Sequence, residues 1–468
     1  MRFISRSIRA LSLISILLFA YDLWARAGGG GGGHGGGGGG GGGHSYGGGG
    51  GGHSYGGGGQ SYGGGGGGSG SGGEEVAFLI IIIVIFLIYK AKGGGNGNGR
   101  ADFSTNEFPD GRAHINAGKP VTSELRAKIE TAFRTVQRAW SDQNLSIMRR
   151  FISDGVYQRF NAQFTMMNLL GQKNPISNIR IYSIDQMTKA DDGDSMYESI
   201  DIRIDASADD QFVCAWYPNL NSPGGNERFV EYWSFIRRRD HKAGKDIYNS
   251  NLCPQCNAPL DPKMMTDARC SYCGSYINNG EFDWVLSEIT QENDYSQSAP
   301  TLLSADPAGA DPSFSVQMLE DKASNAFTQI LIASATGDAK ALRRFSTDEE
   351  FEKLRVNIGT KKTIYNRLFV NSVVTREVSA ENGVFSATVD IRYTFNQIEN
   401  GEESGEMVLD QTMTMVHRPS SNVSKGSIYA NACPTCGAPQ KDSLSHVCAY
   451  CGAIMNDITR EWLVGDLS

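Results

Sequence analysis

Eight of the chain's nine cysteines form four CxxC pairs, and the pairs are arranged two by two. Zinc favours four thiolate ligands in a tetrahedron, and each CxxC turn supplies two of them. Four thiolates leave no open coordination position for water, so the zinc would be structural and not catalytic. The sequence therefore predicts two zinc ions per chain, in zinc ribbons at residues 251–275 and 431–453. Their ligands would be Cys253, Cys256, Cys270 and Cys273 in the first ribbon and Cys433, Cys436, Cys448 and Cys451 in the second.

The loops between the pairs are similar in length, with 13 residues in the first ribbon and 11 in the second. Gly274, Gly437 and Gly452 follow three of the pairs, where a left-handed backbone conformation is useful. A redox role for the CxxC pairs is the alternative, but a thioredoxin-type pair would follow a strand and open a helix. Four cysteines suffice without His446, and Cys214 has no partner and is expected to be a small core residue.

The chain that carries the ribbons is acidic. Residues 101–468 contain 36 Lys and Arg against 48 Asp and Glu, a formal net charge of −12. Such a charge gives no bulk attraction to phosphate backbones. Between residues 250 and 282 the basic Lys263 and Arg269 are outnumbered by Asp261, Asp267 and Glu281. Nucleic acid is therefore not an expected partner.

The cysteine pattern recurs because the chain from residue 119 reads as one unit written twice. The predicted units are 119–290 and 314–468. Residues 291–313, rich in Ser, Ala, Pro and Asp, are predicted to be a linker between them. The matching segments are 132–151 with 326–345, 201–203 with 390–392, 253–256 with 433–436, and 283–286 with 461–464.

Each unit is predicted to begin with helices and to continue with strands. Apolar residues recur at helical spacing from Leu125 to Trp140 and from Val316 to Ile330. Alternation of apolar and polar residues then indicates strands, as at Ile200, Ile202 and Ile204. Helices followed by a run of strands predict an α+β fold, with an antiparallel sheet packed on helices.

The N-terminal segments have a different character. Residues 1–27 resemble a secretory signal peptide, with Arg2, Arg6 and Arg9 before a 12-residue apolar run. An uncleaved anchor is the alternative. Residues 28–75 are Gly-rich and cannot form a core, so a solvated tether is expected. Weak metal binding by the three histidines of this tract is the alternative.

Residues 76–92 are predicted to form one transmembrane helix, followed by a linker over 93–118. The segment contains 14 consecutive apolar residues from Val76 to Tyr89, and its flanks extend them. A buried core strand is the alternative. Acidic residues precede the segment and Lys90, Lys92 and Arg100 follow it, which places the C-terminal side in the cytoplasm. That reducing compartment favours metal thiolates over disulfides.

The repeated unit also carries a family pattern. The first unit has Phe133, Val136, Gln137, Ala139, Trp140, Leu145, Met148 and Arg149, then Glu231-Tyr232-Trp233-Ser234-Phe235, and closes on Trp284-Val285-Leu286. The second keeps Ala326-Phe327, Leu342-Arg343 and Trp462-Leu463, with Gln411 and Thr412 in place of the Trp233 region. In these residues the chain resembles the Tim-forty-four-like domain of the mitochondrial import-motor anchor and of bacterial membrane-anchored proteins.

The resemblance implies two tandem domains of the nuclear-transport-factor-two-like fold, with a pocket between the helices and a curved sheet. Each zinc ribbon would be inserted near the domain's last strand. It further implies a scaffold in the bacterial inner membrane, with a single span, the Gly-rich tract outside and both domains cytoplasmic. The scaffold would bind unidentified proteins, and contact with the membrane surface is a second expectation.

Anionic lipid could contact the basic run of Arg237, Arg238 and Arg239, which continues to Lys242 and Lys245. A solvated strand end is the alternative interpretation of that run.

No nucleophile constellation is visible, so the chain is not expected to be an enzyme. Two other functions stay open. One is a small-ligand-binding or enzymatic cavity of the same fold, with the repeated Asp201 and Asp390 as candidate carboxylates. The other is a zinc and thiol redox sensor.

Overall fold

The computed structural model describes residues 119–468 except 188–195, 243–245, 262–267, 293, 296–300, 312, 360–361, 400–401, 421–432, 434, 437 and 439–446. The predicted signal peptide, Gly-rich tether, transmembrane helix and first linker lie outside the described residues. Within the described part of the chain, no helix combines the length and apolar character needed to cross a membrane. All described residues belong to one compact unit.

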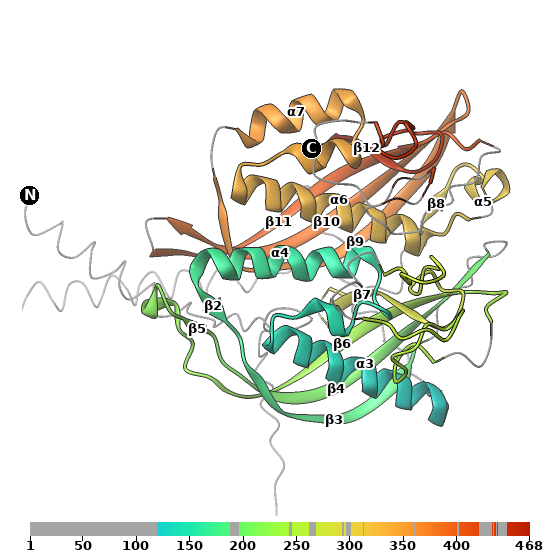
Figure 1. Ribbon diagram of the computed structural model, residues 1–468. Helices are drawn as coiled ribbons and strands as arrows, with labels where there is room; N and C mark the ends of the chain where they lie inside the picture. Colours follow the sequence, from blue (N-terminus) through green and yellow to red (C-terminus); the bar gives the residue numbers. More distant parts are fainter. Residues whose placement is uncertain are drawn as a thin grey trace, which may run out of the picture. The chain divides into compact units, whose positions relative to one another are not determined.

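The fold is mixed α+β and contains two five-stranded sheets (Figure 1). The first sheet is antiparallel throughout. In the second sheet only the short β8–β9 pair is parallel. The first sheet has the order β1 (Lys119–Pro120), β3 (Ile176–Gln186), β4 (Tyr197–Asp210), β6 (Gly225–Arg238), β7 (Val285–Gln291). The second has the order β12 (Leu463–Leu467), β11 (Glu402–His417), β10 (Val384–Glu399), β9 (Ile364–Glu381), β8 (Leu302–Leu303). A separate pair joins β2 (Gln172–Lys173) and β5 (Val213–Cys214).

Helices precede the long strands of each sheet, as the sequence predicts. Before the first sheet come α3 (Ser123–Ser141), η1 (Leu145–Ile147) and α4 (Asp154–Leu170), and η2 (Pro218–Leu220) lies between β5 and β6. Before the second come α5 (Pro307–Ala310), α6 (Val316–Thr336), η4 (Lys340–Arg344) and α7 (Asp348–Ile358). The longer helices begin at hydroxyl side chains that accept a backbone N–H of the first turn. These capping residues are Thr122, Ser153, Ser315 and Thr347.

Each sheet buries a large apolar cluster against its helices. In the first, Phe133 of α3 packs on Trp233 of β6, with ring centroids 5.4 Å apart. In the second, Phe327 of α6 packs on Tyr393 of β10 at 5.0 Å. Both predicted helices are present. The apolar stripe of α3 is its buried face, whereas α6 is buried on nearly all sides, polar residues such as Asp321 and Ser324 included.

Helix α4 contributes to both clusters. Its residues Val156, Phe160, Phe164 and Met167, which recur at helical spacing, belong to the first cluster. Ala162 and Met166, on another face, belong to the second. Gln163 also donates to the backbone carbonyl of Leu368 on β9, at 2.7 Å. A helix buried on two faces joins the two sheets through shared packing.

The segment predicted to be a linker, residues 291–313, contains ordered elements. Leu302 and Leu303 form β8, which pairs with Glu377 and Val378 of β9. Pro307 then opens the short helix α5, and the side chain of Asp306 accepts the Gly309 N–H. These short elements lie within the predicted linker, and two residues of backbone pairing leave no periodic signal in a Ser- and Pro-rich stretch.

Candidate metal centres

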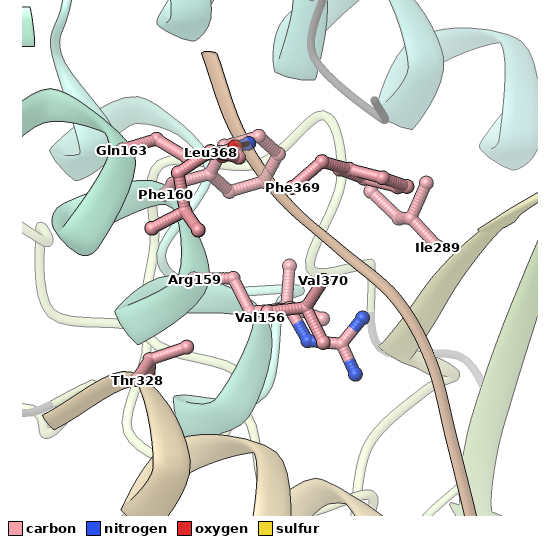
Figure 2. A pocket seen from close by; sticks show the side chains of 9 residues that line it. All are labelled: Val156, Arg159, Phe160, Gln163, Ile289, Thr328, Leu368, Phe369 and Val370. Atoms are coloured by element: carbon pink, nitrogen blue, oxygen red, sulfur yellow. Dashed lines mark hydrogen bonds between the residues drawn. The ribbon is translucent and has the colours of Figure 1, made fainter. Parts of the chain in front are cut away.

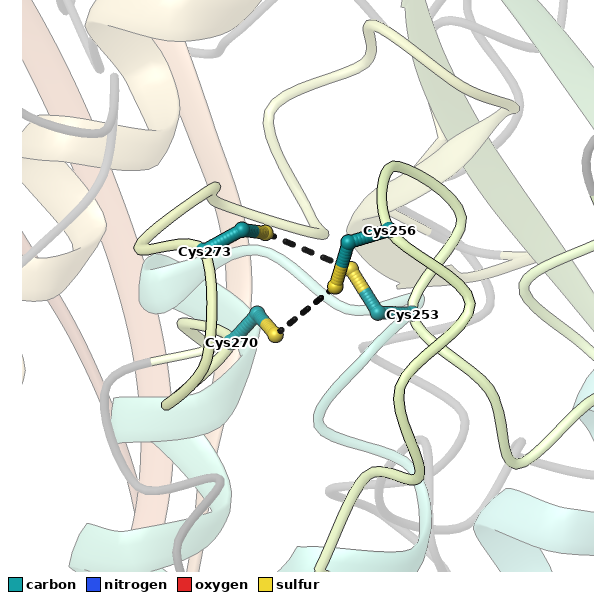
Figure 3. A group of neighbouring side chains, drawn as sticks. All are labelled: Cys253, Cys256, Cys270 and Cys273. Carbon is teal, nitrogen blue, oxygen red and sulfur yellow. Dashed lines mark hydrogen bonds between the residues drawn. The ribbon is translucent and has the colours of Figure 1, made fainter.

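The structure brings the eight predicted cysteines together as two groups of four sulfurs. Within each group all four sulfurs lie within 4.8 Å of one another. Figure 3 shows the first group, in which Cys253 and Cys273 approach to 3.7 Å and Cys256 and Cys270 to 3.8 Å. The second group repeats these separations, at 3.7 Å for Cys433–Cys451 and 3.8 Å for Cys436–Cys448.

The separations fit a metal centre and not disulfides. Sulfurs about 2.3 Å from a tetrahedral zinc ion stand about 3.8 Å apart, whereas a disulfide bond measures about 2.05 Å. All eight cysteines are free. Each group could therefore hold one metal ion, and a set of four thiolates suits zinc.

Tight backbone turns build three of the four knuckles, those whose following residue the structure describes. In the first ribbon the Asn257 N–H donates to the Cys253 carbonyl at 2.8 Å, and the Gly274 N–H to the Cys270 carbonyl at 2.9 Å. In the second, Gly452 donates to Cys448 in the same way at 2.9 Å. Asn257, Gly274 and Gly452 all have positive φ, between 60° and 74°. The expected left-handed conformation is thus present at Gly274 and Gly452, while Gly437 lies outside the described residues.

Both groups have the same distribution of burial. Cys253 and Cys270 are buried in the first, and Cys433 and Cys448 in the second, while the other four cysteines are exposed. The buried sulfurs come from the first cysteine of each knuckle, so the metal would sit under the ribbon surface.

The surroundings of the sulfurs favour one thiolate in each metal-free group. A hydrogen bond from the Ser275 hydroxyl lowers the pKa of Cys273 to about 6. Burial alone would raise the pKa of Cys448, but backbone N–H groups of Cys451 and Tyr450 bring it to about 7. Burial raises the pKa of Cys253 to about 12. A thiolate among thiols attracts a cation, and metal binding then displaces the remaining protons.

The ribbons occupy matching places in the two sheets. The first lies between β6 and β7, and the second between β11 and β12. Asn278, after the first ribbon, donates to the carbonyl of Ile152 at 2.9 Å. Asn456, after the second, donates to the carbonyl of Ser346 at 3.2 Å. Both ribbons are therefore inserted before the last strand of their sheet and are attached beside the helices.

The two candidate carboxylates of the alternative function do not share a site. Asp201 is buried and not solvated. Its side chain accepts a hydrogen bond from the Tyr295 hydroxyl at 2.8 Å. Asp390 belongs to the other sheet, where Arg376 donates to it at 2.6 Å and Thr412 at 3.1 Å. Each carboxylate thus serves local structure.

The basic run that begins at the end of β6 is largely paired with acidic side chains. Arg237 contacts Glu198 at 2.6 Å and lies over the Trp284 ring, with 4.1 Å to the centroid. Arg238 contacts Asp240 at 2.7 Å. In the same region Lys242 contacts Glu281 at 2.6 Å, and Lys245 lies outside the described residues. Glu198 and Asp240 therefore neutralise part of the positive charge that Arg237 and Arg238 could offer to an anionic lipid.

A buried polar network between α4 and α6 has no counterpart in the sequence prediction. Asp321 of α6 accepts hydrogen bonds from the Ser153 hydroxyl and from the Gly155 N–H, the latter at 3.1 Å. Arg159 of α4 donates to Ser324 of α6 and forms an ion pair with Glu288 of β7. The only signal for Asp321 in the sequence is an acidic residue inside an apolar helical stripe.

Figure 2 shows a cavity beside this network. Val156, Arg159, Phe160 and Gln163 of α4 line one side, facing Thr328 of α6, Ile289 of β7 and Leu368, Phe369 and Val370 of β9. The enclosed volume is about 20 Å³, which is room for roughly one water molecule. No carboxylate lines it, so this cavity provides no acid–base site.

Comparison with known proteins identifies no family. No family model and no curated protein matches the chain. Among solved structures, the intermembrane space region of chloroplast protein ARC6 matches with 8% identity and a TM-score of 0.20, covering 26% of this chain and 90% of that one. An Ntf2 like protein involved in plasmid conjugation matches with 10% identity and a TM-score of 0.15, covering 60% and 90%. TM-scores this low carry no argument about fold or function.

Proposed function

We propose that this protein is a non-enzymatic, membrane-anchored scaffold made of two Tim-forty-four-like domains, each stabilised by one structural zinc ion. The observation that carries the proposal is the pair of four-sulfur groups with tetrahedral spacing. Four sulfurs close the coordination shell, so the metal would stabilise a ribbon and would not bind substrate.

Matching long-range contacts support the tandem arrangement. Lys128 of α3 contacts Asp283 at 2.8 Å, and Lys322 of α6 contacts Glu461 at 3.6 Å. Each acidic residue immediately precedes the tryptophan that leads into the last strand. A duplicated domain accounts for both contacts, since each lysine has the same place in its helix relative to the repeat.

The ribbons also support a role in protein binding. Tyr272 and Tyr450 occupy the same position in the second knuckle of their ribbons, within the sequence Cys-x-Tyr-Cys. Their exposed fractions are 69% and 59%. Exposed tyrosines are frequent in protein interfaces, because the ring is apolar and the hydroxyl forms hydrogen bonds. The partners are unidentified proteins that the two ribbon tips would contact.

The anchor rests on the sequence of residues 76–92 and the orientation on the charges that flank it. We place the protein in a bacterial inner membrane, with the Gly-rich tract outside and both domains in the cytoplasm. Contact of Arg237, Arg238 and Arg239 with anionic lipid is a secondary part of this proposal.

The first test is the zinc content and the number of free thiols of the purified chain. Two zinc ions per chain and no disulfide would agree with the proposal. No zinc together with paired disulfides would overturn both the metal sites and the reducing location. Replacing Tyr272 and Tyr450 by Ala should then reduce capture of membrane-associated proteins while the zinc content stays unchanged. Capture equal to that of the wild type would argue against protein binding by the ribbon tips.

One observation favours a small-ligand site as a second candidate. Asp321 lines a hollow of the second domain together with Asn325, Arg344 and Glu461, and burial raises the pKa of Asp321 to about 7. A carboxyl group with a pKa near neutrality can exchange protons with a ligand. Isothermal titration with small carboxylic acids and amines tests this candidate, and absence of heat for all of them would reject it.

A further inference from the structure

Strand β11 has one edge that β12 covers only in part. β11 is 16 residues long, whereas β12 has five (Figure 1). Their pairing runs from Val416 to Met413 and continues to Thr412, which exchanges two backbone hydrogen bonds with Ser468, both of 3.0 Å. Within the described part of the chain, no strand pairs with the same side of residues 406–411. This open edge is about 20 Å long and has room for one short extended peptide.

The backbone groups of the open edge have a definite arrangement. In a regular antiparallel strand the N–H and C=O groups of one residue point to the same side, and those of the next residue point to the opposite side. The groups of Thr412 face β12. The pairing of β11 with β10 shows no irregularity between residues 406 and 412. The N–H and C=O groups of Glu406, Val408 and Asp410 therefore face the open side, where a further strand could bond them.

The side chains of the open edge alternate between the two faces of the sheet. Met407 and Leu409 are half-buried and pack against the core cluster of the second sheet. Glu406, Val408 and Asp410 are exposed on the opposite face, and Val408 is 53% exposed. A strand added at this edge would therefore place alternate side chains beside Met407 and Leu409. Its other side chains would lie beside Glu406 and Asp410.

The charge of the edge determines which of these other side chains fit. Residues 402–411 contain four acidic residues and no lysine or arginine. Asp410 is paired with Arg392 at 2.8 Å. No described residue forms an ion pair with Glu406, and desolvation by neighbouring groups raises the pKa of this side chain. A cationic side chain would supply the missing partner. A second copy of β11 would bring like charges, so pairing between two such edges is disfavoured.

We propose that residues 406–411 bind an extended segment of a partner protein in which apolar residues alternate with lysine or arginine. The segment continues the line of β12 along β11 and bonds the backbone groups of the open side. Its apolar side chains extend the core beside Met407 and Leu409, and its cations lie beside Glu406 and Asp410. This surface is separate from both zinc ribbons, so its failure to bind would leave the proposed role of the ribbon tips untouched.

Binding of short synthetic peptides to the full chain, measured by fluorescence anisotropy, tests the proposal. The probe is a peptide of alternating lysine and valine, blocked at both ends. A peptide of the same composition, with its lysines and valines in two separate blocks, controls for charge alone. A peptide of alternating glutamate and valine controls for the sign of the charge. The alternating lysine peptide should bind about tenfold more tightly than either control. Absence of binding, or equal binding of the two lysine peptides, would overturn the proposal.

Charge reversal on β11 locates the site. Glu406→Lys should weaken binding of the alternating lysine peptide about tenfold. It should also strengthen binding of the glutamate peptide, a gain that misfolding cannot produce. Glu124→Lys makes the same change of charge at an 81% exposed side chain of α3 and should leave both affinities unchanged. If Glu406→Lys and Glu124→Lys behaved alike, the peptide would bind elsewhere and the proposal would be wrong.

A proline substitution tests the backbone contribution. Val408→Pro removes an N–H group that faces the open side, so no hydrogen bond to β10 is lost, but a strand can no longer be added there. It should abolish binding of the alternating lysine peptide. Val408→Thr keeps the N–H group and should bind this peptide as the wild type does. Wild-type affinity in Val408→Pro would show that the peptide does not pair as a strand.

A photo-reactive benzophenone group in the alternating lysine peptide gives an independent readout. Its adducts with the wild-type chain are located by peptide mass spectrometry and should contain residues 406–411. Adducts confined to another segment of the chain would reject the open edge of β11 as the binding surface.

Discussion

The carboxylate of Asp321 on α6 lies against the first turn of α4, where the Gly155 N–H donates to it at 3.1 Å. The hydroxyl of Ser153, the residue that caps α4, donates to the same carboxylate. A group at a helix N-terminus accepts N–H groups that have no partner within the helix. Asp321 thus provides a second cap for α4, from a helix that lies more than 150 positions later in the chain.

Asp321 should make the stability of the protein depend on pH. Burial raises the pKa of Asp321 to about 7, and the nearby Asp154 adds to the rise, while Ser153, Gly155 and Arg159 oppose it. The ordinary pKa of an unfolded Asp is about 3.9. The folded state therefore binds the proton more tightly than the unfolded state. The stabilisation that protonated Asp321 contributes is fully present below about pH 4. It is lost as the pH rises through 7, and the total loss is roughly 4 kcal/mol.

Urea unfolding between pH 4 and 8 measures this contribution. Asp321→Asn cannot ionise, so its free energy of unfolding should fall less than that of the wild type over this range. Other carboxyl groups titrate equally in both proteins and cancel in the comparison. If the free energies of unfolding of the two proteins changed in parallel with pH, the raised pKa of Asp321 would be contradicted.

Gly155 should be intolerant of any side chain. A Cβ at this position would lie 2.2 Å from the Asp321 side chain and 2.6 Å from its backbone oxygen. The backbone contact cannot be relieved by a rotamer change, so Gly155→Ala should destabilise the chain by about 1–3 kcal/mol or more. Gly225→Ala is the matched control, because a Cβ at that position would have no atom within 4 Å. Equal urea midpoints for the two variants would show that α4 and α6 do not approach this closely.

Loss of Lys128 should cost more stability than loss of Lys322. Asp283, the partner of Lys128, is buried, and removing the lysine leaves a buried charge without its cation. Such a loss typically costs about 3–5 kcal/mol. Glu461 keeps Arg344 when Lys322 is removed, so Lys322→Met should cost less. Lys340→Met is the control, because Lys340 and Asp338 form an exposed pair at 3.9 Å, worth about 0–1 kcal/mol. Chemical unfolding of the three variants should give this order, and a larger loss for Lys340→Met would contradict it.

The two metal centres should lose zinc independently. Cys253→Ser should leave one zinc per chain, and so should Cys433→Ser, because each replaces a buried ligand of a separate group. Cys214→Ala should keep both, since the Cys214 thiol donates to the Leu170 carbonyl at 2.9 Å and belongs to neither group. Elemental analysis by plasma mass spectrometry gives the stoichiometry. Loss of both zinc ions from a single substitution would show that the centres are coupled.

The metal centres were predictable from the sequence because their geometry is local. A CxxC turn fixes two sulfurs within four residues, and a short loop of 11 or 13 residues brings in the second turn. The apolar stripe of α3 was predictable for the same reason, since its period depends only on helix geometry. The α+β class follows from the order of such local patterns, and the structure confirms it.

Only the tertiary structure decided which partner each buried face would meet. The period of α4 indicates an apolar face with Phe160, but not that Ala162 and Met166 enter a second core. Asp201 alternates with isoleucines as a solvated residue would, yet Tyr295, some ninety positions later, covers it. Asp321 and Gly155 are 166 positions apart. Periodicity records which side of an element is buried, whereas the identity of its neighbour depends on contacts between distant parts of the chain, and these leave no local pattern.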